Sequence, residues 1–194
     1  MKKIFIAGGT HGFGICLAKA FSKKYDVIIN GRVKVAGYKT IIKDMVDLTV
    51  NDLKKHNPYI IINNGFDKED YFHSYKASIN VLKNSYEFFK EKKTGKIINV
   101  NSVYGIIPDS KDPDYAAAKH GLKGYSDSIS AEAYKNNIQI LNIYPRAMAV
   151  GINAGRLDFN ELINPDEVAE FIVNMCNTKS FYISSIQFDR IGKF

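Results

Sequence analysis

The chain has 194 residues, 45% of them hydrophobic, and a formal net charge of +7. It contains no low-complexity tract and no run near the roughly 20 apolar residues that cross a bilayer, so a membrane-spanning helix is excluded. We predict a single domain, 1–194, because a chain of this size buries roughly 70% of its unfolded surface.

Charge, cysteines and histidines limit the ligands that we expect. The lysines are scattered rather than gathered in one run, which favours a solvated basic surface over a nucleic-acid site. Cys16 and Cys176 belong to no CxxC or Cys/His cluster and are predicted to be free, buried thiols in a reducing cytosol. The four histidines lack metal-ligand spacing. We therefore predict a cytoplasmic protein with no metal and no nucleic-acid or membrane partner.

Short apolar runs alternate with segments of helical spacing along the chain. The predicted strands are 3–7, 27–30, 59–63, 96–101, 138–144 and 181–188. The predicted helices are 13–24, 71–92, 115–135 and 165–177, the last capped by Asn164. This alternation predicts an α/β fold with one doubly wound parallel sheet of the Rossmann type. Ligands of such a fold bind at the carboxyl ends of the strands.

A glycine-rich turn, Gly8-Gly9-Thr10-His11-Gly12-Phe13-Gly14, joins the first strand to the first helix. Its glycines allow the backbone to approach a diphosphate while the amino end of the helix faces the negative charge. Glycines at such a turn also serve close packing. The turn alone leaves both interpretations open.

Tyr115 and Lys119 are four residues apart, the spacing at which two side chains share one helix face. A free phenol has a pKa of about 10, and a cation about 4 Å away contributes about 4 kcal/mol at an effective dielectric near 20. Lys119 is therefore predicted to lower the pKa of Tyr115 and to make it a proton-transfer group. Each residue taken singly also suits an ordinary core tyrosine or surface lysine.

Seven landmarks follow one another in the chain: the glycine turn, Asp47-Leu48-Thr49, Asn63-Asn64-Gly65, Asn80, Ser102, Tyr115-x-x-x-Lys119 and Pro145. Their order resembles that of the short-chain dehydrogenase/reductase family from the first strand to the last. The resemblance implies an oxidoreductase that uses a nicotinamide dinucleotide. The three-residue gap between tyrosine and lysine favours carbonyl or alcohol chemistry over the reduction of a carbon-carbon double bond.

The resemblance also implies catalytic roles. Tyr115 would be the acid or base, Lys119 would lower its pKa, and Ser102 would hydrogen-bond the substrate oxygen as charge develops on it. Asn80 would hold a water behind Lys119.

The implied cofactor-binding residues lie at the carboxyl ends of the strands. Asp47 and Leu48 would flank the adenine, and residues 63–65 would pack beside the adenosine ribose, although a helix cap or a turn also explains them. The full predicted set is Gly8, Thr10, His11, Gly12, Phe13, Gly14, Arg32, Asp47, Leu48, Asn63, Asn64, Gly65, Tyr115, Lys119, Pro145 and Met148.

The end of the second predicted strand indicates which dinucleotide is used. An acidic residue there would bind the ribose hydroxyls of NAD and repel an added phosphate, and none is present. Gly31 would leave room, Arg32 would bind a 2′-phosphate, and His11 would be a second cation. NADP is favoured over NAD, although Arg32 is also explained as a solvated loop residue.

The chain departs from the family in several places. It is shorter than usual, with little room between Asp47 and Asn63 for the customary helix and a brief segment at 150–164 where substrate is normally covered. Arg146 replaces a glycine after Pro145, and Val150 replaces a threonine. Arg146 is predicted to contact an anionic substrate or a cofactor phosphate. The departures also leave open a second class of function, a dinucleotide-binding sensor or regulatory protein without turnover.

The helix that carries Tyr115 has a surface of small residues, which permits close approach of another backbone. In the family this helix, together with the one bearing Asn80, commonly forms a dimer interface. We expect a homodimer or homotetramer, against the alternative that the surface packs on the chain's own sheet. The small residues are Ala116, Ala117, Ala118, Gly121 and Gly124.

Overall fold

The computed structural model describes residues 1–67, 69–178 and 180–191. Seven strands in the described ranges form one parallel sheet in the order β3-β2-β1-β4-β5-β6-β7, which confirms the doubly wound α/β prediction. The chain passes from β1 outward to β3 and then returns past β1 to build the other half. The strands are β1 (Lys3–Ala7), β2 (Asp26–Gly31), β3 (Lys39–Ile42), β4 (Ile60–Asn63), β5 (Gly95–Val100), β6 (Ile138–Pro145) and β7 (Ser185–Phe188).

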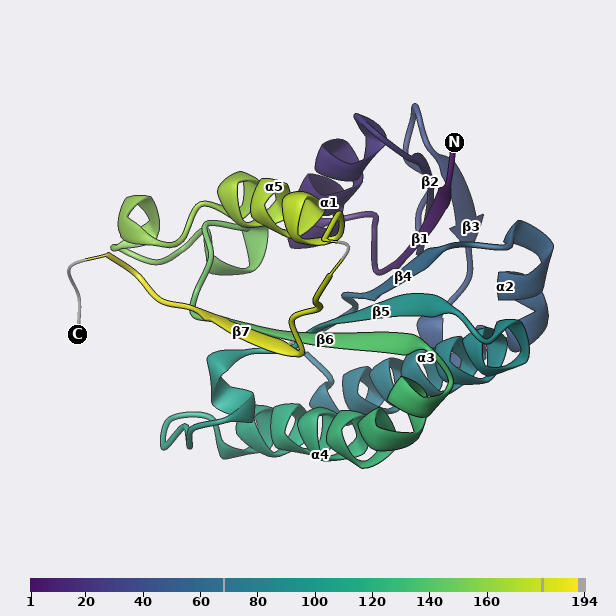
Figure 1. Ribbon diagram of the computed structural model, residues 1–194. Coiled ribbons are helices and arrows are strands. Elements are labelled where there is room, and N and C mark those ends of the chain that lie inside the picture. Colours follow the sequence, from purple (N-terminus) through teal and green to yellow (C-terminus); the bar gives the residue numbers. More distant parts are fainter. Residues whose placement is uncertain (68, 179, 192–194) are drawn as a thin grey trace.

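Helices cover both faces of this sheet (Figure 1). In the view of Figure 1, α1 and α5 lie above the sheet and α3 and α4 lie below it. None of the described helices is long and apolar enough to cross a membrane. The helices are α1 (Gly12–Ser22), α2 (Val50–His56), α3 (Tyr71–Lys92), α4 (Pro113–Lys135) and α5 (Pro165–Met175), with short 3-10 turns η1 (Met45–Asp47), η2 (Val103–Gly105), η3 (Gly151–Asn153) and η4 (Phe159–Glu161).

Two apolar clusters, one on each face, hold the layers together. Ile4 and Ile6 of β1 point toward α1 and α5, whereas Phe5 between them points toward the cluster that includes α3. This alternation follows from the two-residue period of a strand, and the continuous apolar sequence of β1 and β4 follows from burial on both faces. The side chains of Ile4, Phe5 and Ile6 are fully buried.

Two elements of the structure, β3 and α2, were not predicted from the sequence. β3 has four residues, none of them buried, so the sequence offers no apolar run there. The two-turn helix α2 fits into the short segment between Asp47 and Asn63, where little room for a helix was expected. It begins at a capping box in which Thr49 accepts from the Asp52 amide and Asp52 accepts from the Thr49 amide.

The helices α4 and α5 begin with strong capping signals. Asp112 caps α4 by accepting a hydrogen bond from the Tyr115 amide at 3.1 Å, and Pro113 occupies the first turn. Asn164 caps α5 as predicted, accepting from the Asp166 amide at 2.9 Å. The cap on α4 sets the helical phase of Tyr115 and therefore of Lys119.

A row of asparagines crosses the sheet behind its carboxyl edge. Asn63 is paired with Asn99, and Asn99 with Asn142, in the register of β4, β5 and β6. Asn63 donates to Asn99 at 3.2 Å and Asn99 donates to Asn142 at 3.1 Å, while Ser126 of α4 donates to Asn142 at 2.9 Å. These buried hydrogen bonds connect α4 to the strands that it covers.

Candidate active site

The glycine turn packs against the loop that follows β4. A Cβ on Gly8, whose φ is +72°, would lie 2.6 Å from Gly65, and one on Gly14 would lie 2.0 Å from the Gly8 carbonyl oxygen. Asn64 donates to that same oxygen at 2.9 Å. Close packing therefore accounts for Gly8 and Gly14, and the two loops that were predicted to bind the dinucleotide lie side by side.

The amino end of α1 has the features of an anion site. His11, its N-cap residue, makes no side-chain cap, and the first turn contains no acidic residue. Amide groups that lack a cap and face the positive end of the helix dipole suit a diphosphate. The loop after β6 also reaches this point, because a Cβ on Gly12 would lie 3.9 Å from Val150. These residues fit a dinucleotide.

At the end of β2 the structure corrects one expectation. The space beside Gly31 is filled by Thr10, whose Oγ1 would lie 2.3 Å from a Cβ at this position, so Gly31 accommodates Thr10 rather than a ligand. Arg32 is exposed and forms a 3.0 Å ion pair with Asp67. His11 accepts or donates a 2.9 Å hydrogen bond with Thr10. Thr10, which is bound to His11, thus brings the glycine turn against the end of β2, the strand that Arg32 follows.

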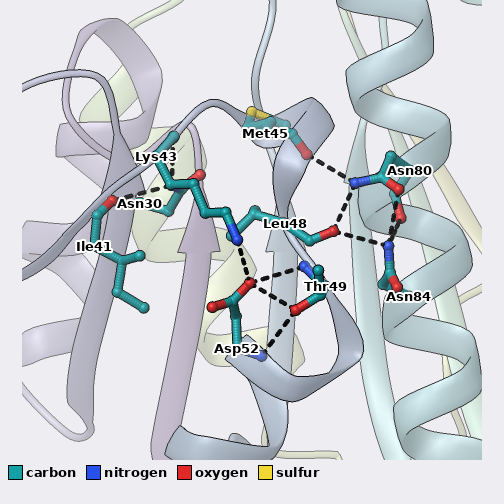
Figure 2. Close-up of polar contacts among 9 residues, drawn as sticks. All are labelled: Asn30, Ile41, Lys43, Met45, Leu48, Thr49, Asp52, Asn80 and Asn84. Atoms are coloured by element: carbon teal, nitrogen blue, oxygen red, sulfur yellow. Dashed lines mark hydrogen bonds and ion pairs between the residues drawn. The ribbon is translucent and has the colours of Figure 1, made fainter.

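The predicted adenine loop is held by α3 (Figure 2). Asn80 donates to the carbonyl oxygens of Met45 at 2.9 Å and Leu48 at 2.8 Å, and its own Oδ1 accepts from Asn84 at 2.9 Å. The Asn80 side chain therefore supports the loop that carries Asp47 and Leu48. Both amide hydrogens are directed at η1 and the residue after it, and the role of Asn80 in holding a water behind Lys119 stays a prediction.

Ser102, Tyr115 and Lys119 converge between η2 and α4. Ser102 is buried and hydrogen-bonds the Tyr115 phenol, and the Lys119 ammonium lies 5.7 Å from the centre of the Tyr115 ring. Asn101 donates to the Lys119 carbonyl at 3.1 Å and so joins the end of β5 to α4. The shared helix face predicted for Tyr115 and Lys119 is confirmed.

Burial dominates the titration of both groups. It raises the pKa of the Tyr115 phenol above its ordinary value, and the hydrogen bond with Ser102 opposes this effect. It lowers the pKa of the Lys119 ammonium to about 7. The lowered pKa that was predicted for Tyr115 is therefore wrong, because removal of the phenol from water is the largest effect on it and raises its pKa.

The segment after β6 closes the carboxyl edge. Pro145 ends the strand, and Met148 is buried beneath the loop in a bridge with Ile163. The Arg146 guanidinium hydrogen-bonds the carboxylate of Asp189. Asp189 thus compensates part of the Arg146 charge, and contact of Arg146 with an anionic substrate or a cofactor phosphate stays a prediction. Residues 150–164 form two 3-10 turns that are mostly exposed.

Three aromatic residues surround the Tyr115 ring, and two of them, Phe66 and Tyr71, were not assigned to the site from the sequence. Phe66 approaches the Tyr115 ring edge-on at 4.9 Å between centroids, Tyr71 lies at 5.7 Å and Tyr104 at 6.1 Å. We call Phe66, Tyr71 and Tyr104 the aromatic cluster. Phe66 directly follows the Asn63-Asn64-Gly65 landmark, which is the one signal that pointed to it, whereas nothing in the sequence pointed to Tyr71.

Comparisons with known proteins agree with this geometry. Residues 69–160 match the family described as short chain dehydrogenase. The chain is 24% identical to 3-oxoacyl-[acyl-carrier-protein] reductase of Chlamydia trachomatis, over 94% of this chain and 93% of that protein. It is also 24% identical to the peroxisomal hydratase-dehydrogenase-epimerase of Neurospora crassa, over 90% of this chain but only 23% of that much longer protein.

A solved structure shows the same fold. It is 3-ketoacyl-(acyl-carrier-protein) reductase from Brucella melitensis, determined with NADH, which superposes with a TM-score of 0.80 at 19% identity over 96% of each chain. The landmark order, the matched family and the parallel sheet with its glycine turn lead to one assignment. The chain is similar to the short-chain dehydrogenase/reductase family in sequence over residues 69–160 and in fold over nearly its whole length.

Proposed function

We propose that this chain is an NAD(P)-dependent oxidoreductase that interconverts a small carbonyl compound and its alcohol. The observation that carries the proposal is the meeting of Ser102, Tyr115 and Lys119 at the carboxyl edge of the sheet, beside a helix amino end suited to a diphosphate. Relatives named as reductases and dehydrogenases support the same class of reaction.

The proposed mechanism divides the work between cofactor and chain. The dinucleotide supplies or accepts the hydride when bound. Ser102 hydrogen-bonds the carbonyl oxygen and orients it toward Tyr115. Tyr115 donates its phenolic proton to that oxygen during reduction, and a raised pKa keeps the phenol protonated at neutral pH. Lys119 binds the cofactor and stabilises the phenolate that remains.

Loss of the phenol tests the assignment. Tyr115→Phe should lower kcat at least about 100-fold, because general acid catalysis contributes about 10²–10⁴-fold, while NADPH still binds. Absorbance at 340 nm with a panel of aldehydes, ketones and alcohols measures turnover. Tyr125→Phe, on the same helix, serves as the control. Full activity in Tyr115→Phe would refute the mechanism.

NADP is the proposed cofactor, on the strength of Arg32 and His11 beside the glycine turn and the lack of an acidic residue at the end of β2. Solved chains of this fold hold NADP in some cases and NAD+ or NADH in others, so the fold is neutral on this point. Asp67 competes for Arg32 in the protein without cofactor.

Removing the guanidinium separates the two cofactors. Arg32→Ala should raise the KM for NADPH by about 10-fold or more and leave the KM for NADH within about twofold, since charge-assisted bonds contribute about 1.5–3 kcal/mol. Initial rates with each dinucleotide measure the effect. An equal change for both cofactors would contradict the assignment of Arg32 to the 2′-phosphate.

A second function is a dinucleotide-binding sensor without turnover. It is favoured by the compensated Arg146 and by the brief, exposed segment 150–164, which provides little cover for a substrate. Binding of NADPH with no turnover on any substrate of the panel would support it.

We also propose a homodimer built on α3 and α4, as in the family. Gly121 is used within the chain, because a Cβ there would lie 2.7 Å from Tyr75 of α3. Gly124 has nothing within 4 Å of its missing side chain, and Ala117, seven residues earlier, is also exposed. Two small exposed residues on one stripe of α4 permit a second helix to approach closely.

A further inference from the structure

The Phe66 ring covers the Lys119 ammonium. The nitrogen lies 4.2 Å from the centre of the ring, closer than its 5.7 Å distance to the Tyr115 ring. Lys119 is 5% exposed, and in the described part of the chain no oxygen accepts a hydrogen bond from its ammonium. The face of an aromatic ring is therefore the main partner of this charge.

The backbone on both sides of Phe66 is fixed to α3. Ser78 donates to the Gly65 carbonyl at 3.2 Å. Ser74 accepts from the Asp67 amide at 2.7 Å and donates to the Asp67 carbonyl at 3.0 Å. Because the residues before and after Phe66 are both bound, the ring is held in place by the main chain as well as by its own packing.

A second aromatic ring supports Phe66 from outside. Tyr71 stacks on it at 5.6 Å between centroids, and the Tyr71 hydroxyl donates to Asp112 at 2.5 Å. Asp112 is the N-cap of α4, the helix that carries Lys119. The contact therefore joins the start of α3 to the start of α4 across the site. Phe66 lies between Tyr71 and the Tyr115–Lys119 pair.

We propose that Phe66 is a positioning residue: its ring excludes water from the Lys119 ammonium and holds that ammonium against Tyr115, where it can meet a bound dinucleotide. The part of this inference that concerns the dinucleotide rests on the proposed function. The part that concerns Lys119 and Phe66 does not, since both residues touch in the protein alone.

The charges around Lys119 agree with this assignment. Burial alone lowers its pKa, to about 7. Asp112 and Asp109 act on Tyr115, whose pKa they raise, and Asp112 is already bound by Tyr71. The access of water to the ammonium therefore determines the charge of Lys119, and the Phe66 ring limits that access. The titratable groups that face this region are Tyr115 and Asp112 of α4, Tyr71 of α3, Tyr104 of η2 and Asp109 in the loop before α4.

Two substitutions of Phe66 should move the titration of Lys119 in different directions. Phe66→Ala admits water, which favours the charged form, so the titration should move up by about one pH unit or more. Phe66→Leu still excludes water but offers no aromatic face, so the titration should stay or move down. NMR of the lysine side-chain nitrogens in the cofactor-free protein measures both, with Lys119→Met identifying the signal.

A matched control exists in the first turn of α3. Phe72 also has a lysine over its ring, Lys76 at 4.5 Å, but Phe72 is 67% exposed and lies outside the site. Phe72→Ala should leave the titration of Lys119 unchanged. A thermal melt of each variant shows that it is folded. The proposal is overturned if Lys119 titrates at the same pH in the unchanged protein and in a folded Phe66→Ala variant. It is also overturned if Lys119 titrates at a higher pH in Phe66→Leu.

NADPH binding gives the second readout. Affinity, followed by NADPH fluorescence because the chain has no tryptophan, should decline as pH rises through about 7, where Lys119 loses its charge. In Phe66→Ala the decline should move to higher pH together with the titration, and a decline at the same pH would count against the role of Phe66. If the unchanged protein binds no NADPH, the proposed function fails, and the lysine titration alone decides about Phe66.

Discussion

Burial of a single residue, Lys119, lowers the stability of the folded protein. Its pKa is about 7 in the folded protein and about 10.4 in an unfolded chain, so between these values the unfolded chain binds more protons and stability rises with pH. Below pH 7 the full cost of burying the charge is present. Residues placed for chemistry commonly carry such a cost.

Replacing this lysine by an apolar residue should remove the cost. Lys119→Met should stabilise the protein by on the order of a few kcal/mol at pH 6 and by less at pH 9, while activity is lost. Denaturant melts at both pH values measure the change. Lys123→Met, at an exposed position one turn further along α4, is the control and should show no such pH-dependent gain. Equal effects of the two substitutions would contradict this account.

At the scale of elements, the asparagine row couples the strands to α4. Asn99 is fully buried and contacts Asn63, Asn142 and Ser126. A side chain with three polar partners in the interior leaves several groups unpaired when it is removed. Asn99 also precedes Ser102 by three residues at the end of β5, so the row supports the strand end that carries Ser102.

Asn99→Ala should destabilise the protein by about 2–4 kcal/mol, since each buried group left without a partner costs about 1–3 kcal/mol. The midpoint of urea unfolding measures it. Asn174→Ala, at an exposed position of α5, should change stability by less than about 0.5 kcal/mol. A loss at Asn99 no larger than that at Asn174 would show that the row contributes little.

Elements with long apolar runs or strong caps could be predicted from the sequence, and the others could not. The range of α3 was predicted as observed, and β1 and β4 stood out because both of their faces are buried. β3 and α2 were missed because a half-exposed strand and a seven-residue helix depend on their neighbours. At the site, the pairing of Tyr115 with Lys119 followed from helical spacing. The direction of the Asn80 amide and the place of Phe66 depend on tertiary packing.

At the scale of the whole molecule, the open stripe on α4 tests the proposed assembly. Gly124→Arg places a long charged side chain where nothing lies within 4 Å, so the fold of one chain should tolerate it while a helix of a second chain cannot approach. Sedimentation velocity should show a dimer for the unchanged protein and a monomer for the variant. Ser128→Arg, exposed one turn later, is the comparison. A monomer in the unchanged protein would refute the dimer.

The place of β1 inside the sheet has a consequence for how the chain acquires its structure. β1 leaves the ribosome before β4, which begins at Ile60, and yet the two strands pair in the sheet. Its three most apolar side chains, all fully buried at the end, have no complete cover until that later strand is available. Pairing between strands that are distant in sequence slows folding and leaves apolar surface exposed until the later strand is present. β1 is therefore a segment that a chaperone would be expected to bind until β4 has been made.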